Sequence, residues 1–194
     1  YHTLLADSLE NEKDFESSLL MFRSRSVDGI IAVPVGNTSA AVEDIAGNIP
    51  TVLIDRYFGG TSLPYICTDN YVGGYMATEY LINRGFRHIL SIQGVEDSTP
   101  SMERVKGFKD AINAHSDKRV EYAIVGDAFS VENGYEQVRR VFSEGVKYDA
   151  VFAYSSTILL GAIRAFRELG IKIPEQVGII SFDNNGFLDF LDPA

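Results

Sequence analysis

Residues 81–92 read Leu-Ile-Asn-Arg-Gly-Phe-Arg-His-Ile-Leu-Ser-Ile, and this stretch decides the fold. Its last part, 88–92, is an apolar run, whereas the residues that lead into it repeat apolar side chains at helical spacing. Gly85 stands between the two patterns, where a left-handed helix C-cap belongs. The stretch therefore predicts a helix that ends near Gly85 and turns into a strand, which is one step of an α/β fold.

The same alternation continues in both directions along the chain, and it is typical of βαβ units and a parallel sheet. The predicted strands are residues 2–6, 29–33, 51–54, 65–67, 88–92, 122–125, 150–153 and 177–182. The helical patterns between them carry apolar stripes that we expect to be buried: Phe15, Leu19 and Phe22; Val72, Met76 and Tyr80; Val105, Phe108 and Ile112; Tyr135, Val138 and Phe142; Ile158, Ala162, Ala165 and Leu169. Continuous apolar strands suit a sheet covered by helices on both faces.

The stretch 57–64 is the most loop-like part of the chain, and it marks a boundary between two subdomains. We place the first lobe in residues 1–68 and the second in residues 69–194.

The composition narrows the class of protein. The chain has 194 residues, with 27 acidic and 17 basic side chains and a formal charge of −10. A surface this acidic does not replace the counterions around a duplex, so a DNA partner requires another domain. Apolar runs such as 29–35 are far shorter than the roughly 20 residues of a membrane helix, which predicts no membrane span.

The single cysteine, Cys67, excludes an intrachain disulfide, and no cysteine or histidine cluster has the spacing of a metal site. We therefore expect a cytoplasmic chain that holds no metal. The chain begins at Tyr1 without a methionine and without a leader-like segment, so we expect no signal peptide and we expect the chain to be a fragment.

Ligands of open parallel sheets bind beyond the carboxyl ends of the strands, and three side chains there are candidates. Asp183 directly follows an apolar strand; the alternative is an Asx turn or a helix cap. Arg104 lies near the start of a predicted helix, where the helix dipole disfavours a cation; the alternative is a solvated surface arginine. Phe129 suits stacking on a sugar or a base, or packing in the core. A guanidinium with a carboxylate suits vicinal hydroxyls or a purine edge.

Catalytic patterns are weak. The three histidines, His2, His88 and His115, have no nucleophile in recognisable spacing. The chain has neither a Gly-x-x-x-x-Gly-Lys-Ser/Thr phosphate loop nor a Gly-x-Gly-x-x-Gly motif after the first predicted strand. The sequence favours a binding protein over an enzyme, with no cofactor.

A series of motifs in a fixed order carries a family resemblance over essentially the whole chain. The motifs are Val27-Asp28-Gly29-Ile30-Ile31; Pro50-Thr51-Val52-Leu53-Ile54-Asp55-Arg56; Thr68-Asp69-Asn70 with Gly73-Gly74-Tyr75-Met76-Ala77; Leu81 to Ile89; Arg104-Val105-Lys106-Gly107-Phe108; Gly126-Asp127 with Asn133-Gly134-Tyr135; and Gly170 to Val177 leading to Ser181-Phe182-Asp183-Asn184. Together they resemble the effector-binding region of LacI/GalR-type bacterial transcriptional regulators, a type I periplasmic-binding-protein fold.

The resemblance implies two doubly wound parallel-sheet lobes, with a small ligand in the cleft between them. The first lobe is expected to be incomplete, because its first strand and following helix have no counterpart here. Asp69 lies at the first crossing between lobes, and a second crossing is expected after Asp189. The implied partners are a sugar or purine-like effector, a second copy in a homodimer, and operator DNA bound by a helix-turn-helix headpiece outside this chain. Closure of the cleft on the effector would change the spacing of the headpieces.

The positions that match the family's ligand contacts are Arg104 and Asp183, with Phe129 as the stacking aromatic and Asp69 near the hinge. Where family members usually carry an Asn-Asp pair, this chain has Ser155 and Ser156. A serine is shorter and offers no amide, which weakens the expected sugar contact at Ser155. Ser156 is expected to cap the following helix.

Two other functions stay open on the sequence alone. A secreted solute-binding protein of a sugar transporter shares the fold, and only the segments 85–89 and 173–183 favour the regulator. A hydrolase or dehydrogenase on a doubly wound sheet would need the nucleophile or phosphate loop that the patterns lack.

Overall fold

The structure is a computed structural model and describes residues 2–36, 38–143, 148–186 and 188. It confirms the predicted α/β class, and its paired strands are all parallel. The chain divides into two compact units, Tyr1–Thr68 with Ser98–Pro100 and Asp69–Asp97 with Ser101–Ala194. Within the described part of the chain, no helix combines the length and the apolar character that a membrane crossing requires. The second crossing predicted after Asp189 lies outside the described residues.

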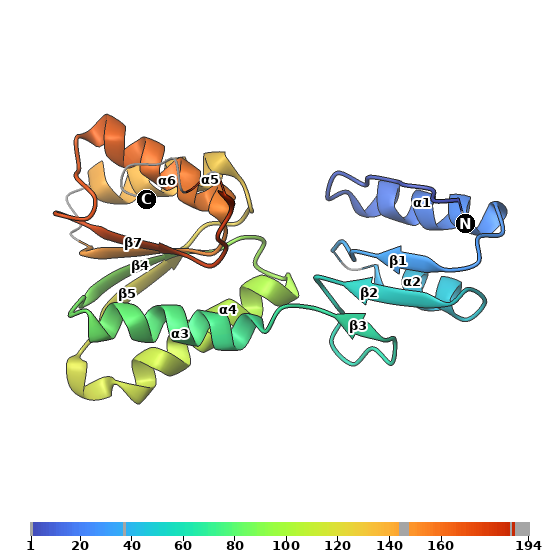
Figure 1. The fold of residues 1–194 in the computed structure, drawn as a ribbon, viewed down its shortest axis with the longest axis horizontal. Coiled ribbons are helices and arrows are strands. Elements are labelled where there is room, and N and C mark those ends of the chain that lie inside the picture. The colour runs from blue at the N-terminus through green and yellow to red at the C-terminus, as the bar shows by residue number, and fades with distance from the viewer. Residues whose placement is uncertain (1, 37, 144–147, 187, 189–194) are drawn as a thin grey trace. The chain divides into compact units, whose positions relative to one another are not determined.

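The first unit packs two helices with a parallel sheet of three strands in the order β1-β2-β3 (Figure 1). Its elements are α1 (Glu12–Ser24), β1 (Ile30–Ala32), α2 (Ser39–Ala46), β2 (Thr51–Ile54) and β3 (Tyr65–Ile66). Asn11 starts α1, since its side chain accepts hydrogen bonds from the backbone N–H groups of Lys13 and Asp14. Leu19 of α1, Ile45 of α2 and Leu53 of β2 belong to one buried cluster, which is the core of this unit.

The strand predicted for residues 2–6 is wrong, because the structure assigns these residues to no strand. All other predicted strands are present, with ends that shift only slightly. A strand exists only where its backbone pairs with a neighbour, and the neighbour that β1 pairs with is β2. The segment 2–6 was predicted as a strand from its composition, but it has no partner strand within the described residues.

The second unit is built on four parallel strands in the order β5-β4-β6-β7. They are β4 (His88–Ile92), β5 (Glu121–Val125), β6 (Ala150–Ala153) and β7 (Gly178–Ser181). Ile92 pairs with Val125 and with Ala153, and Ala153 pairs with Ser181. The strands therefore end at the same level, and their carboxyl ends form one edge of the sheet.

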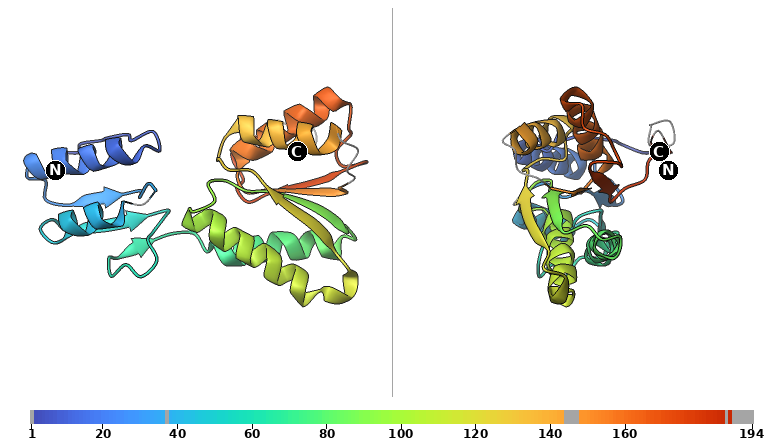
Figure 2. Two further views of the ribbon diagram at one scale, coloured as in Figure 1. Left: turned by 180° about the vertical axis from the view of Figure 1, so that it is seen from behind. Right: turned by 90° about the vertical axis from the view of Figure 1, so that its left-hand side faces the viewer.

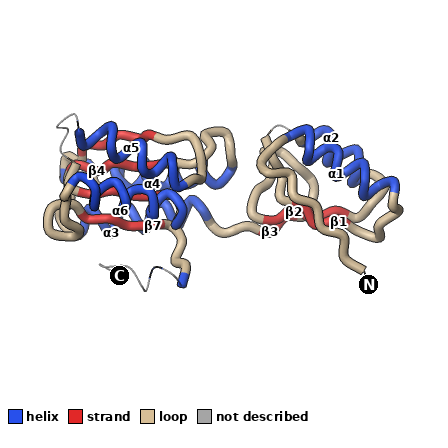
Figure 3. Tube along the Cα trace, turned by 90° about the horizontal axis from the view of Figure 1, so that it is seen from above, coloured by secondary structure: helices blue, strands red, loops and turns tan. Residues whose placement is uncertain are grey.

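Helices cover both faces of this sheet, as predicted. They are α3 (Asn70–Asn83), α4 (Thr99–Ala114), the 3-10 turn η1 (Ser116–Lys118), α5 (Val131–Ser143) and α6 (Ser156–Leu169). Figures 1 and 2 show α3 and α4 on one face and α5 and α6 on the other, and Figure 3 shows the helices of this unit running along its strands. Ile89, Phe108, Phe152 and Phe166 are completely buried between the layers.

Glycines stand where the helices of each pair cross. An added Cβ would come against backbone atoms of the facing helix at each of them: Gly74 of α3, Gly107 of α4, Gly134 of α5 and Gly161 of α6. Real Cβ atoms do not approach backbone so closely, so the helices lie backbone against backbone at these points.

The apolar stripe predicted for α3 is wrong in phase. Val72, Met76 and Tyr80 are 43%, 62% and 50% exposed. The buried face of α3 instead carries the residues Gly74, Thr78, Leu81 and Ile82. Because the crossing with α4 needs a small residue, Gly74 turns inward and the larger apolar side chains turn out.

Glu168 of α6 lies at the centre of a cluster of polar and charged side chains on α5 and α6, and these contacts lower its pKa. Glu168 accepts hydrogen bonds from the Tyr135 hydroxyl at 2.6 Å and from Arg139 and Arg164 at 3.2 Å each. The hydrogen bond from Tyr135, followed by the contacts of Arg164 and Arg139, lowers the pKa of Glu168 below its ordinary value. Since the folded-state pKa is the lower one, ionised Glu168 stabilises the fold above the unfolded pKa of about 4.3, and this contribution is lost as the pH falls through the folded-state pKa.

We therefore expect Glu168→Gln to lower the free energy of unfolding at neutral pH, and we expect the difference from wild type to vanish in acid. Urea unfolding at a series of pH values measures it, with Glu136→Gln on the exposed face of α5 as the control. A difference that stayed constant down to low pH would contradict the depressed pKa.

Candidate functional site

Arg104 of α4 is the charged centre of the carboxyl edge of the sheet in the second unit, and only 7% of it is exposed. Its Nε donates to Oδ1 of Asn70 at 2.9 Å, and its Nη1 donates to the carbonyl oxygen of Tyr154. The guanidinium carbon lies 3.5 Å from the ring centroid of Phe182 and 6.0 Å from that of Phe129. A buried cation is stable only where such hydrogen bonds and aromatic faces compensate its lost hydration. The side chain of Arg104 is therefore fixed by these contacts, and the alternative of a solvated surface arginine is wrong.

Phe129 follows β5, and its ring both packs in the core and lies near Arg104. Its ring packs against the main core cluster and against Gly94, where an added Cβ would overlap the ring. The same ring stands 6.0 Å from the Arg104 guanidinium. The glycine therefore makes room for an aromatic wall beside the arginine.

Asp183 follows β7 and is exposed. The residue before it is Phe182, whose ring stacks on Arg104. Two residues further on, the side-chain amide of Asn185 donates to the hydroxyl of Ser156 at the start of α6. The segment around Asp183 is therefore anchored by the contact of Phe182 with Arg104 and by the hydrogen bond of Asn185 to Ser156. The Asp183 carboxylate is exposed to solvent, so it carries no large desolvation cost.

The helix cap predicted for Ser156 is wrong, because Ser155 is the N-cap of α6. The Ser155 hydroxyl accepts from the backbone N–H of Ile158 at 3.2 Å and lies 2.8 Å from the hydroxyl of Thr157. Ser156 is the first helical residue, and its hydroxyl accepts from Asn185 instead. Ser155, predicted as a weakened ligand contact, thus has a structural partner of its own.

Asp69 is the N-cap of α3, and its Oδ1 accepts from the backbone N–H of Val72 at 2.9 Å. The side chain that reaches Arg104 is that of the next residue, Asn70. Asp69 lies at the boundary between the two compact units, as the first residue of the second.

The other four predicted residues lie beside Arg104 or next in sequence to its contacts. Phe129 lies beside it, whereas Asp69, Ser155 and Asp183 are sequence neighbours of residues that contact it: Asn70, Tyr154 and Phe182. These three contacts were not among the predicted site residues, although Asn70 and Phe182 lie inside the motifs that carry the family resemblance. The carboxyl edge thus combines guanidinium donors, an exposed carboxylate and aromatic faces.

Tyr154 lies beneath the arginine at the end of β6 and is completely buried. Burial raises the pKa of its phenol, so the hydroxyl stays protonated at neutral pH. The polar group that Tyr154 presents to Arg104 is its backbone carbonyl. In the described residues no group of three His, Cys, Asp or Glu side chains is placed to hold a metal ion.

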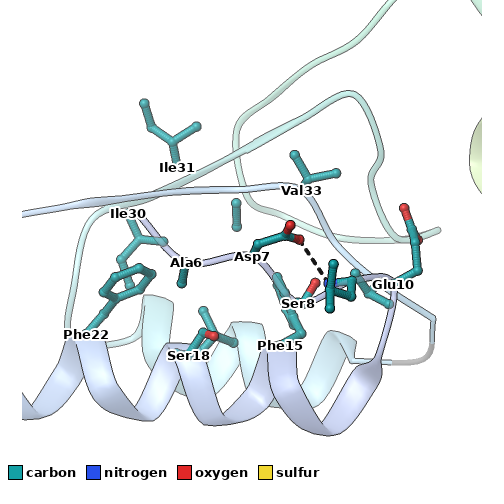
Figure 4. Close-up of a pocket in the computed structure, with 14 residues that line it drawn as sticks. Ala6, Asp7, Ser8, Glu10, Phe15, Ser18, Phe22, Ile30, Ile31 and Val33 are labelled. Atoms are coloured by element: carbon teal, nitrogen blue, oxygen red, sulfur yellow. Dashed lines mark hydrogen bonds between the residues drawn. The ribbon is translucent and has the colours of Figure 1, made fainter. Parts of the chain in front are cut away.

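A separate cavity of about 280 Å³ lies in the first unit. Figure 4 shows it between α1, β1 and the segment 6–10, where Asp7 accepts a hydrogen bond from the backbone N–H of Leu9 at 2.9 Å. Its wall is mixed: Phe15, Phe22 and Ile30 line it together with polar residues such as Asp7 and Ser18. None of the five predicted ligand residues lines it.

Comparison with known proteins identifies the family. The profile of the periplasmic binding protein-like domain matches residues 78–194. The chain belongs to this family. The match covers β4 to β7, which are all four strands of the sheet in the second unit, and it includes Arg104.

Members of the family that resemble this chain are transcriptional regulators. The HTH-type transcriptional repressor PurR of Actinobacillus pleuropneumoniae serotype 3 (strain JL03) is 32% identical over 195 residues, which are 100% of this chain and 58% of that protein. The ribose operon repressor of Haemophilus influenzae is 26% identical over 193 residues, with the same two shares of 100% and 58%. The chain thus spans a little over half the length of these relatives.

A solved structure with the same architecture is that of a sugar-binding transcriptional regulator of the LacI family from Escherichia coli. It is 26% identical to this chain, with a TM-score of 0.82, over 97% of this chain and 69% of that one. The predicted resemblance to LacI-type regulators is confirmed. The three relatives named above are all transcriptional regulators, and none of the three is a secreted solute-binding protein.

Proposed function

We propose that this chain is the effector-sensing region of a bacterial transcriptional regulator and that it binds a sugar or purine-like molecule at the carboxyl edge of the second unit. The observation that supports this is the buried guanidinium of Arg104: the residue is 7% exposed, and its guanidinium lies over the ring of Phe182. Similarity to a sugar-binding regulator and to a ribose operon repressor supports the same class of effector.

The chemistry of the edge suits such a ligand. A guanidinium is a planar fork of N–H donors, and an exposed carboxylate such as Asp183 is an acceptor. Adjacent hydroxyls of a sugar, or the edge of a purine, present the complementary donors and acceptors. The ring of Phe129 offers a face for the apolar side of a sugar ring or for a base.

The regulatory part of the proposal follows from linkage. An effector shifts a conformational equilibrium only by the difference between its affinities for the two states, so we propose that one of two conformations of the regulator binds it more tightly. We further propose that the regulator is a cytoplasmic homodimer, that a headpiece other than these 194 residues contacts operator DNA, and that the effector is bound without being chemically changed. The charge of −10 supports the separation of DNA contact from this chain.

Calorimetry of the purified chain against D-ribose, D-glucose, adenosine and guanine tests the proposal. We expect one of these compounds to bind, and we expect Asp183→Asn to weaken that affinity by about tenfold, because a hydrogen bond to an ionised acceptor contributes roughly 1.5–3 kcal/mol. Asp117→Asn, in the turn η1 before β5, is the matched control at the opposite end of the sheet. Failure of every compound to bind, or detectable turnover of a bound one, would contradict the proposed function.

A further inference from the structure

The start of α3 contacts Arg104 at two points and the ring that lies on Arg104 at a third. Asn70, which is 2% exposed, accepts a hydrogen bond from Nε of Arg104 at 2.9 Å. A Cβ added to Gly73 would overlap the ring of Phe182, and one added to Gly74 would lie 2.5 Å from the backbone oxygen of Arg104. The start of α3 therefore lies against the side chain and the backbone of Arg104 and against the Phe182 ring that stacks on it.

The carboxamide of Asn70 is not needed to start the helix. That role belongs to Asp69, which accepts from the backbone N–H of Val72. Asparagine is a weak helix former inside a helix, and a buried carboxamide costs free energy unless it is hydrogen-bonded. The hydrogen bond that Asn70 accepts from Nε of Arg104 leads out of its own helix and links α3 to α4.

A hydrogen bond at Nε restricts the orientation of the guanidinium as well as its position. The guanidinium is planar, so Asn70 at Nε and the Tyr154 carbonyl at Nη1 together define the plane in which its N–H groups point. The Phe182 ring, 3.5 Å from the guanidinium carbon, defines one face of that plane. A donor whose direction is set beforehand loses less entropy when a ligand binds, which raises affinity.

We propose that Asn70 is a positioning residue that holds the guanidinium of Arg104 in its binding orientation before any effector arrives. α3 follows directly on the boundary between the two compact units at Thr68 and Asp69. Asn70 therefore also ties the orientation of Arg104 to the segment by which the chain enters the second unit. The consequence for affinity rests on the proposed function, whereas the consequence for the geometry of Arg104 does not.

The first experiment needs no effector. It measures the hydrogen-exchange rate of the Arg104 Nε–H by NMR, with the signal assigned by its loss in Arg104→Lys. We expect Asn70→Ala to speed this exchange by at least about tenfold, and we expect Asn70→Asp, which keeps an acceptor oxygen at the same reach, to leave it slow. An Nε–H that exchanges in Asn70→Ala as it does in wild type overturns the proposal.

The control is Thr78→Val, on the same buried face of α3. The Thr78 hydroxyl is fully buried and donates to the carbonyl of Gly74 within the helix, so its loss weakens α3 without removing a contact of the guanidinium. We expect the Nε–H of Arg104 to stay slow in this variant. If Thr78→Val sped the exchange as much as Asn70→Ala, loosening of α3 would explain both results and positioning by Asn70 would be refuted.

The second experiment repeats the calorimetry with D-ribose, D-glucose, adenosine and guanine. For the compound that wild type binds, we expect Asn70→Ala to weaken affinity about tenfold and Asn70→Asp to restore most of the loss. Equal affinity in Asn70→Ala and wild type would contradict the link to binding. If no compound binds wild type, the proposed function fails, and the exchange rates still decide whether Asn70 positions Arg104.

Discussion

Gly161→Ala is expected to destabilise the second unit by about 2 kcal/mol. An added Cβ would lie 2.6 Å from the backbone nitrogen of Tyr135 and would overlap the carbonyl oxygen of Val131, so α6 can accommodate it only by moving away from α5. Overpacking of this kind costs about 3 kcal/mol at the upper end of its usual range, while the better helix propensity of alanine returns about 1 kcal/mol. Urea unfolding followed by circular dichroism measures the net effect.

The reciprocal glycine sharpens this prediction. A Cβ on Gly134 would lie 2.8 Å from the backbone carbonyl carbon of Ile158 in the same crossing. Once α5 and α6 have separated, a second alanine meets less resistance, so we expect the double variant to lose less stability than the sum of the single ones. Glu136→Ala, on the exposed face of α5, is the control and should stay within about 0.5 kcal/mol of wild type. An unchanged unfolding midpoint in Gly161→Ala would show that the helices do not cross this closely.

Local sequence decided the parts of the fold that were predicted correctly. Gly85, at the predicted helix end, has a φ value of 96°, which is a backbone conformation that a residue without a Cβ adopts at little cost. The run 88–92 forms β4 with the predicted ends. In these segments the residue types alone favour one conformation, so no distant partner has to be known.

Distant partners decided the parts that were predicted wrongly. Residues 2–6 have the composition of a strand, but pairing is a property of two segments and not of one. The exposed side of α3 carries Met76, because the crossing at Gly74 determines which side of the helix turns inward. The periodicity was correct, whereas the phase depended on α4, which begins only after a further strand.

The residues of the candidate site also differ in whether strand positions alone could point to them. Arg104, Phe129 and Asp183 were predicted because the ends of parallel strands meet at one edge, a rule that needs only strand positions. Asn70 and Phe182 were missed, since their contacts with Arg104 depend on how α3 and β7 pack. Asn70 and Phe182 do lie inside the motifs that carry the family resemblance, which is the signal that the sequence offers for them.

Arg104→Met is expected to weaken the binding of the compound that wild type recognises by at least about a hundredfold. Methionine keeps much of the length of the side chain and removes its charge and its N–H donors, and two hydrogen bonds from a charged group contribute roughly 3–6 kcal/mol. The fold should survive, since replacing a buried charge by an apolar side chain removes a desolvation cost that partly offsets the acceptors left on Asn70 and Tyr154.

Two further variants separate charge from shape in the same titration. Arg104→Lys keeps the positive charge and loses the planar fork, so we expect an intermediate loss of about tenfold. Arg84→Met is the matched control, because this exposed arginine also lies over an aromatic ring, 5.0 Å from the centroid of Tyr80, but at the far end of α3. If Arg104→Met bound the compound as tightly as Arg84→Met does, the effector would have to contact another edge of the molecule. A graded loss from lysine to methionine would instead show that the effector reads both the charge of Arg104 and the direction of its fork.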